Sequence, residues 1–292
     1  MTTVDEVGAG EAFLRKCHNQ FPGAMGRYVA ANPLPDGRTS YQVLAEQVTG
    51  AERVLDLGCG DGSLLAVLAR DGAIGLAGID LSAGELALAR ARPELADAEL
   101  LEGRAQRLPF ADDAFDAVVS HMALMLMSDV EQVVAETARV LKPAGRLAIV
   151  VGGRPTPGSG LELFLKLARP TFATAQDAVP PLGDRRTRTR EGLNELLTPA
   201  GFEPIAWTEI APAVDATPEQ VWESALEKYY DVLTLDAAQL RGLREEFVTR
   251  ASTLAAGEQL VRGDRMSLAT TRYRPEQRGS ADDGPPRRAS GQ

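Results

Sequence analysis

The chain has 292 residues, of which 44% are hydrophobic and 25% are charged, a composition typical of a globular protein with a sizeable core. Its formal net charge of −10 repels phosphate backbones, which argues against nucleic acid as the main partner. No CxxC pair, signal-peptide profile or apolar run near the roughly 20 residues of a membrane span is present, so we expect a soluble, cytoplasmic protein with no metal site and no membrane partner.

The first forty residues have a broken helical pattern that contains the turn NPLPDG at residues 32–37. We expect residues 1–45 to form an N-terminal helical lid over the binding edge of the main domain. Tyr28 in this segment is a candidate for lining the substrate site, and His18 is a candidate for folding back over it.

Strand and helix patterns alternate from about residue 51 to residue 153. Short apolar runs predict the strands, and apolar residues at helical spacing predict the helices between them. The expected strands cover residues 53–58, 74–80, 98–103, 115–121 and 145–153, and the expected helices cover residues 63–72, 82–92 and 129–141. Strands separated by such helices imply a mostly parallel sheet with helices on both faces, whose ligand lies beyond the carboxyl ends of the strands.

Two of these helices carry start signals. Ser82 and Glu85 have the S-x-x-E spacing of a capping box, in which each side chain bonds the backbone of the other residue. Asp129 is expected to cap the helix that ends at Lys142-Pro143.

The pattern loosens after residue 153. We expect helices at residues 161–169, 189–201, 217–235 and 236–256, and strands at residues 202–210 and 266–274. The segment DRRTRTR at residues 184–190 is the most basic run of the chain; a solvated helix start is the favoured interpretation, and a local basic groove remains open. Residues 276–292 are rich in Gly, Pro, Ser and mixed charge, which is typical of a disordered tail.

The segment VLDLGCGDG contains the strongest functional signal. Gly58, Gly60 and Gly62 follow a strand and precede a helix, so the backbone there can approach a ligand closely. Asp56 precedes the first of these glycines, and Asp80 ends the next strand, where an acid accepts hydrogen bonds from ribose hydroxyls. Carboxylates in and before the turn would repel the pyrophosphate of a nicotinamide dinucleotide, so an NAD-dependent dehydrogenase is a distant alternative. They favour a cationic ligand such as S-adenosylmethionine.

Four segments occur in order at the intervals of a known family: VLDLGCGDG, GIDLS, GRAQRLPFADDAFDAVVS and RVLKPAGRL. Over residues 50–153 the chain closely resembles a class I S-adenosylmethionine-dependent methyltransferase, of the broad "methyltransferase type 11" group that includes ubiquinone/menaquinone-type enzymes. The resemblance implies a Rossmann-like, doubly wound, seven-stranded sheet with a terminal antiparallel strand. The domain would span residues 46–275, with a helical cap inserted at about residues 155–190 and 212–260.

The resemblance also implies which residues contact the cofactor. The glycine turn would lie along the methionine moiety, Asp80 would hold the ribose, and Leu81 would lie beside the adenine. Many relatives have an acid at the position of Arg104 that accepts the adenine amino group, which arginine cannot do. The adenine would then contact Ala105 and Gln106. A second departure, Ala144 in LKPAG where LKPGG is usual, is expected to be a minor change in a turn. The complete predicted cofactor set is Asp56, Gly58, Gly60, Asp80, Leu81, Arg104, Ala105, Gln106 and Ser120.

The segment SHMALMLM would follow the fourth strand at the methyl end of the cofactor. His121 is the candidate general base or orienting group, because an unperturbed histidine has a pKa of about 6.5. A structural histidine bonded to the backbone is the alternative. Met122 and Met125 are candidates for a compliant substrate wall, with core filling as the alternative.

These observations predict a methyltransferase, monomeric or homodimeric, acting on a small metabolite or natural product of secondary metabolism and releasing S-adenosylhomocysteine. Whether oxygen, nitrogen or carbon accepts the methyl group stays open. Two alternatives keep the same cofactor and fold: a cyclisation aided by the sulfonium charge, and a non-catalytic binding protein.

Overall fold

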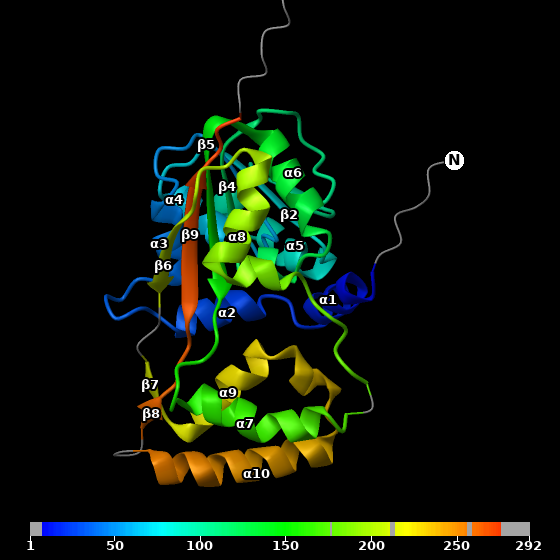
Figure 1. Cartoon of the computed structure of the whole chain (residues 1–292), viewed down its shortest axis with the longest axis vertical. Helices are drawn as coiled ribbons and strands as arrows, with labels where there is room; N and C mark the ends of the chain where they lie inside the picture. Colours follow the sequence, from blue (N-terminus) through cyan, green and yellow to red (C-terminus); the bar gives the residue numbers. More distant parts are fainter. Residues whose placement is uncertain (1–7, 176, 211–213, 256–258, 276–292) are drawn as a thin grey trace, which may run out of the picture.

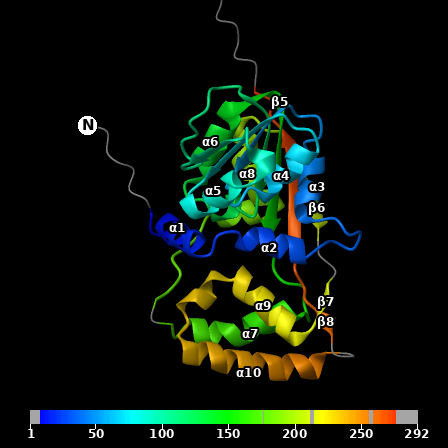
Figure 2. The ribbon, with the colours of Figure 1, turned by 180° about the vertical axis from the view of Figure 1, so that it is seen from behind.

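A computed structural model describes residues 8–175, 177–210, 214–255 and 259–275 of the chain. The expected tail at residues 276–292 and the first seven residues of the expected lid lie outside these ranges. Figure 1 shows a sheet-containing part above and a smaller helical cap below. Two N-terminal helices, α1 (Ala9–Gln20) and α2 (Ala24–Ala31), lie between the two parts (Figures 1 and 2).

The main sheet has seven strands in the order β3-β2-β1-β4-β5-β9-β6. The first five strands in this order pair in parallel, and β9 is antiparallel to both β5 and β6. This arrangement confirms the expected fold class, including the antiparallel strand near the C-terminus. The strands are β1 (Arg53–Leu57), β2 (Gly75–Asp80), β3 (Glu99–Glu102), β4 (Phe115–His121), β5 (Leu141–Gly152), β6 (Ala206–Ile210) and β9 (Met266–Arg272).

Helices cover both faces of the sheet, which explains why β1 and β4 are almost continuous apolar runs. The helices of one face are α3 (Ser40–Glu46), α4 (Ser63–Arg70) and α5 (Ala83–Arg90), and those of the other are α6 (Val130–Val140) and α8 (Arg190–Leu197) (Figures 1 and 2). The parallel strands all end toward α1, α2 and the cap, so ligands that bind at the carboxyl ends of the strands lie at this junction.

Three local expectations need correction. Ser82 does accept a hydrogen bond from the Glu85 amide, but the Glu85 carboxylate turns away to His18 and the Gly23 amide, so the capping box is only half formed. Asp129 occupies the N-cap position of α6 with a left-handed backbone and makes no side-chain cap.

Ala144 is the third correction. It has a φ of 66°, a left-handed conformation that glycine adopts at no steric cost, so alanine here is a strained substitute rather than a minor change. Its amide donates to the Tyr273 carbonyl. This bond ties the turn at the start of β5 to the end of β9.

The cap has its own hydrophobic core. Its elements are α7 (Gly160–Phe172), α9 (Pro218–Lys228), the 3₁₀ helix η5 (Tyr230–Thr234), α10 (Ala237–Leu254) and a small antiparallel sheet of β7 (Asp215–Ala216) and β8 (Leu260–Val261). Phe164 lies at the centre of this core with no exposed surface, stacked on Tyr229 and edge-on to Trp222 and Phe247. The small sheet was not anticipated, because two-residue strands leave no alternation to detect.

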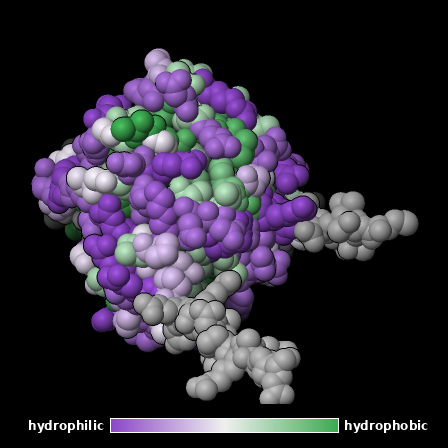
Figure 3. Space-filling view, turned by 90° about the horizontal axis from the view of Figure 1, so that it is seen from above, coloured by the Kyte–Doolittle hydropathy of each residue, from purple (hydrophilic) through white to green (hydrophobic). Residues whose placement is uncertain are grey.

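The surface away from the cap is mostly hydrophilic, with hydrophobic residues scattered in small patches (Figure 3). In the described ranges, no helix combines the length and apolarity needed to cross a lipid bilayer.

Candidate active site

The glycine turn after β1 is held by the acid at the end of β2. Gly58 has a φ of 72°, and a Cβ atom there would lie 2.4 Å from the Cβ of Ala123, so only glycine fits without movement. The Gly60 amide donates to Asp80 Oδ2 at 2.8 Å, and the Ser82 amide donates to Asp80 Oδ1 at 2.9 Å. Burial raises the pKa of Asp80, although these two amide bonds oppose the shift. Asp80 therefore fixes the turn that it also faces.

A small cavity of about 80 Å³ opens beside Asp80 at the ends of β2 and β3. Its walls are mostly apolar. The structure brings the four predicted adenine neighbours into these walls: Leu81, Arg104, Ala105 and Gln106.

An acid that the sequence analysis missed also faces this cavity. Glu11 of α1 is 4% exposed, and its Oε1 accepts hydrogen bonds from Arg104 Nη2 at 3.0 Å, Gln106 Nε2 at 3.0 Å and Ser128 Oγ at 2.7 Å. Burial alone would raise the pKa of Glu11, but the bonds from Arg104, Ser128 and Gln106 outweigh it and hold the pKa below its usual value. A carboxylate is therefore present opposite Arg104, contributed by a helix about ninety residues earlier in the chain.

A larger cavity of about 350 Å³ lies between the carboxyl ends of β1 and β4, α2 and the cap. Residues that line both cavities join them: His18, Gly58, Asp80, Ala123 and Leu126. The larger cavity also brings together the predicted Tyr28, Asp56, Gly60, His121, Met122 and Met125.

Asp56 is a buried acid at the wall of the larger cavity. It is 2% exposed, and its Oδ1 has no hydrogen-bond partner among the described residues. Burial raises the pKa of Asp56 well above its usual range, and the negative charges of Asp80 and Asp61 add to the shift. A cationic group bound beside Asp56 would supply the missing countercharge.

His121 is a buried, neutral histidine. Its Nε2 is 2.9 Å from Ser40 Oγ, its ring lies 4.5 Å from that of Tyr41, and its Nδ1 has no partner within the described segments. Burial lowers the pKa of His121 to about 3. The Ser40 contact accounts for one ring nitrogen, and His121 lines the larger cavity. The proposed base role stays a prediction.

His18 of α1 contacts both α5 and the cap. Its Nδ1 is 3.1 Å from Glu85 Oε1, and its Nε2 is 2.9 Å from the hydroxyl of Tyr230. The imidazole is therefore oriented by a carboxylate on one side and a cap residue on the other. No partner for His18 could be predicted, because Glu85 and Tyr230 come close to it only in the folded chain.

Three predicted site residues, Ser120, Met125 and Tyr28, form hydrogen bonds within the protein. The Ser120 hydroxyl donates to the Leu57 carbonyl and accepts from the Leu124 amide, and Ser120 lines neither cavity; its expected cofactor contact stays a prediction. Met125 Sδ accepts from the Gly152 amide at 3.2 Å. The Tyr28 hydroxyl donates to Asp264, which leaves the Tyr28 ring as the part available to a substrate.

The two joined cavities fit S-adenosylmethionine by their own chemistry. The small cavity offers apolar walls and polar groups at its rim for an adenine, and the glycine turn leaves room for close backbone contact. The unpartnered buried carboxylate of Asp56 suits an amino group, and Asp80, which lines both cavities, is an acceptor of the kind that ribose hydroxyls bond.

Comparison with known proteins agrees with this fit. The model of a family described as a methyltransferase domain matches residues 55–149. The demethylmenaquinone methyltransferase of Tropheryma whipplei is 30% identical over 172 residues, which cover 56% of this chain and 72% of that protein. The methyltransferase GfsG of Streptomyces halstedii is 41% identical over 109 residues, 35% of this chain and 38% of that protein.

Solved structures share the fold at low sequence identity. Phosphoethanolamine N-methyltransferase 2 of Haemonchus contortus, in complex with S-adenosyl-L-methionine, has a TM-score of 0.54 at 18% identity and covers 93% of this chain and 61% of that one. The cyclase SpnF has a TM-score of 0.53 at 22% identity and covers 89% and 95%. Sheet order, glycine turn, acids and sequence similarity together lead to one conclusion: the chain belongs to the class I S-adenosylmethionine-dependent methyltransferase family.

Proposed function

We propose that the chain methylates a small-molecule acceptor that binds in the larger cavity. The observation that carries this proposal is the direct connection between the glycine turn and a cavity of about 350 Å³ covered by the cap. That volume suits a metabolite or natural product rather than a polymer. In this proposal residues 46–275 form the cofactor-binding domain, and the cap inserted in it selects the acceptor.

When bound, S-adenosylmethionine supplies an electrophilic methyl group on a sulfonium. Asp80 would bind the ribose, Asp56 would face the amino group, and the backbone at Gly58 and Gly60 would contact the methionine chain. Leu81, Ala105 and Gln106 would contact the adenine, with Arg104 held in place by Glu11.

The acceptor would lie against Met122, Met125 and the ring of Tyr28. Methyl transfer is an in-line displacement that depends mainly on holding the acceptor atom in line with the sulfonium. His121, neutral and with Nδ1 free of protein partners in the described chain, would orient the acceptor or take its proton.

Calorimetric titration with S-adenosylmethionine, S-adenosylhomocysteine and NAD tests the cofactor part of the proposal. We expect micromolar binding of the first two, no binding of NAD, and about a 100-fold loss in Asp80→Ala, since a charge-assisted hydrogen bond contributes about 1.5–3 kcal/mol. Asp112→Ala is the matched control, because the Asp112 side chain is 74% exposed and pairs only with Arg139 at the surface.

Mass spectrometry of metabolites incubated with the protein and S-adenosylmethionine tests the reaction. We expect a product that is heavier by one methylene unit, together with S-adenosylhomocysteine. A rearranged product of unchanged mass would indicate cyclisation instead, and cofactor binding without any turnover over a broad acceptor panel would indicate a binding protein.

A further inference from the structure

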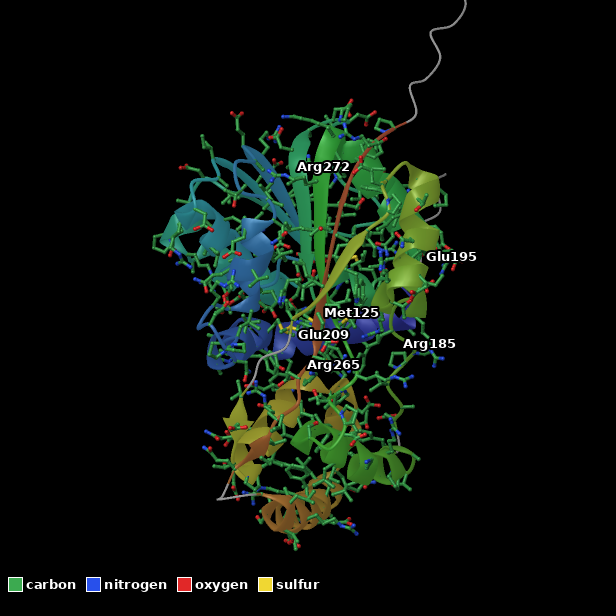
Figure 4. All side chains as sticks on the ribbon, turned by 60° about the vertical axis from the view of Figure 1, so that its left-hand side comes forward. Met125, Arg185, Glu195, Glu209, Arg265 and Arg272 are labelled. Atoms are coloured by element: carbon green, nitrogen blue, oxygen red, sulfur yellow. The ribbon has the colours of Figure 1, made fainter. Side chains whose placement is uncertain are left out.

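Arg188 brings a positive charge to the wall of the larger cavity. It ends the 3₁₀ helix η3 (Arg185–Arg188) within the basic run DRRTRTR, whose function the cofactor site leaves unexplained. Of the two interpretations of this run, a solvated helix start describes Arg185, which is exposed at the outer edge of the molecule (Figure 4). Arg188 is likewise exposed, but it also lines the cavity, which a solvated helix start does not explain.

The loop that carries Arg188 is packed tightly against the segment after β4. Gly183 has a φ of 62°, and a Cβ atom there would lie only 2.1 Å from the Met125 carbonyl oxygen. Thr187 has no exposed surface, and its hydroxyl donates to the Asp184 carbonyl at 2.6 Å. These contacts fix the backbone next to Arg188, so its guanidinium is presented from a rigid support.

The hydrogen-bonding capacity of Arg188 is largely unused. Its Nη1 lies 3.2 Å from Met125 Sδ, a weak acceptor, and its Nη2 lies 3.4 Å from the Met125 carbonyl oxygen. No carboxylate among the described residues forms an ion pair with it. The neighbouring Arg186 differs, because it pairs with Asp184, Glu131 and Glu195. One arginine of the loop is therefore neutralised, and the arginine at the cavity is not.

The charges that the sheet side brings to the cavity are segregated, while the cap side adds Glu227, Lys228 and Asp231. Asp56 and Asp80 lie at the ends of β1 and β2, whereas Arg188 contacts Met125, whose sulfur accepts from Gly152 at the end of β5. Because β4 separates β1 from β5, the span from β2 to β5 is about 14 Å at the usual strand spacing. Asp56 and Asp80 suit a cationic cofactor. Arg188, on the β5 side of the cavity, suits a negatively charged group of a second ligand.

We propose that Arg188 binds a carboxylate of the methyl acceptor and sets a preference for acceptors with a single negative charge. A guanidinium matches a carboxylate through two parallel hydrogen bonds. Lys228, the other long cationic side chain at this cavity, is bonded to Asp264 at 2.6 Å, so Arg188 is the one of the two without a carboxylate partner among the described residues. Met122 and Leu182 nearby suit the apolar body of such an acceptor. The proposal rests on the proposed function, methyl transfer in the larger cavity.

The test titrates the full chain, saturated with S-adenosylhomocysteine, with 2-naphthoate and with 2-naphthamide, two planar probes of the same shape. We expect the wild-type protein to bind the carboxylate at least about tenfold tighter than the amide. Arg188→Met should reduce the preference for the carboxylate to within about twofold. Arg188→Lys should keep part of the preference, because lysine retains the positive charge but cannot form two parallel hydrogen bonds. Arg185→Met, an exposed arginine of the same loop, is the matched control and should keep the wild-type ratio.

Binding of S-adenosylhomocysteine is measured first in every protein. Its absence in the wild-type protein would contradict the proposed function, whereas its presence in Arg188→Met shows that the variant is folded. With the cofactor product bound, three results overturn the role of Arg188: equal binding of the two probes by the wild-type protein, binding of neither, or an unchanged ratio in Arg188→Met.

Discussion

The cofactor half of the molecule and the cap are built from the sequence in different ways. The glycine turn, Asp56 and Asp80 belong to two short segments at the ends of adjacent parallel strands. The cap core instead joins Phe164 of α7 with Tyr229 and Phe247, which follow far along the chain, at ring-centroid distances of 5.7 and 5.9 Å. A binding site made of local segments has a recognisable pattern, whereas a core made of distant segments does not.

The two parts meet at a buried polar junction. Asp264, in the crossing from β8 to β9, accepts from Tyr28 of α2, Lys228 of α9 and Arg262. Burial would raise the pKa of Asp264, but the charges of Lys228 and Arg262 and the bonds from Lys228 and Tyr28 hold it below its usual value. The junction thus connects α2, the cap and the segment that leads into β9 through one carboxylate.

The largest expected effect tests whether the two parts are independent. Phe164→Ala should destabilise the cap by about 3–5 kcal/mol, because it removes a fully buried ring from the aromatic core. Hydrogen exchange should show faster exchange in α7, α9 and α10, while calorimetry shows binding of S-adenosylhomocysteine unchanged within about threefold. A loss of more than tenfold in that affinity would mean that the cap and the cofactor half form one cooperative unit.

The next effect lies in the cofactor half. Gly58→Ala should cost about 3 kcal/mol of unfolding free energy and abolish cofactor binding, since it adds overlap with Ala123 to the strain of a left-handed backbone. Gly37→Ala is the matched control: its φ is 84°, nothing lies within 4 Å of the added Cβ, and it should cost only about 1 kcal/mol. Urea unfolding measures both, and equal costs would show that close approach at Gly58 has no effect.

The smallest effect concerns His121 and pH. The pKa of His121 is about 3 in the folded protein, below the 6.5 of an unfolded chain, so between these values the unfolded chain binds more protons. Stability is therefore lost as pH falls below 6.5. From pH 6.5 to 5.0 the wild-type protein should lose roughly 1.5 kcal/mol more than His121→Gln. Urea unfolding at several pH values measures this difference, and parallel curves would mean that His121 titrates normally.

The sheet and the cofactor turn could be predicted from the sequence because their signals are local. Apolar runs, glycines after a strand and acids at strand ends identify β1 to β5 and the positions of Asp56, Gly58 and Asp80. The antiparallel strand near the C-terminus, β9, was expected from the family resemblance. Leu81, Ala105 and Gln106 line one cavity for the same reason, since they follow the ends of β2 and β3.

Contacts between distant segments could not be predicted. Glu11 lies in a helix with no motif, and only folding brings it to Arg104. The Ser82 capping box was half formed because His18 and Gly23 compete for the Glu85 carboxylate. Ser120 was expected at the cofactor by its position, and its hydroxyl bonds the Leu57 carbonyl at the end of β1 and the Leu124 amide after β4.

The Glu11 contact has a consequence for the order of events during turnover. Glu11 reaches the small cavity from α1 and bonds Arg104 and Gln106 of its wall as well as Ser128, so we expect α1 to move before a nucleoside enters or leaves. In the proposed function the acceptor binds in the larger cavity, which Glu11 does not line, so we expect acceptor exchange to leave these bonds intact. We therefore expect ordered kinetics, in which the nucleoside binds first and leaves last, and in which its residence time reports the opening of a single helix.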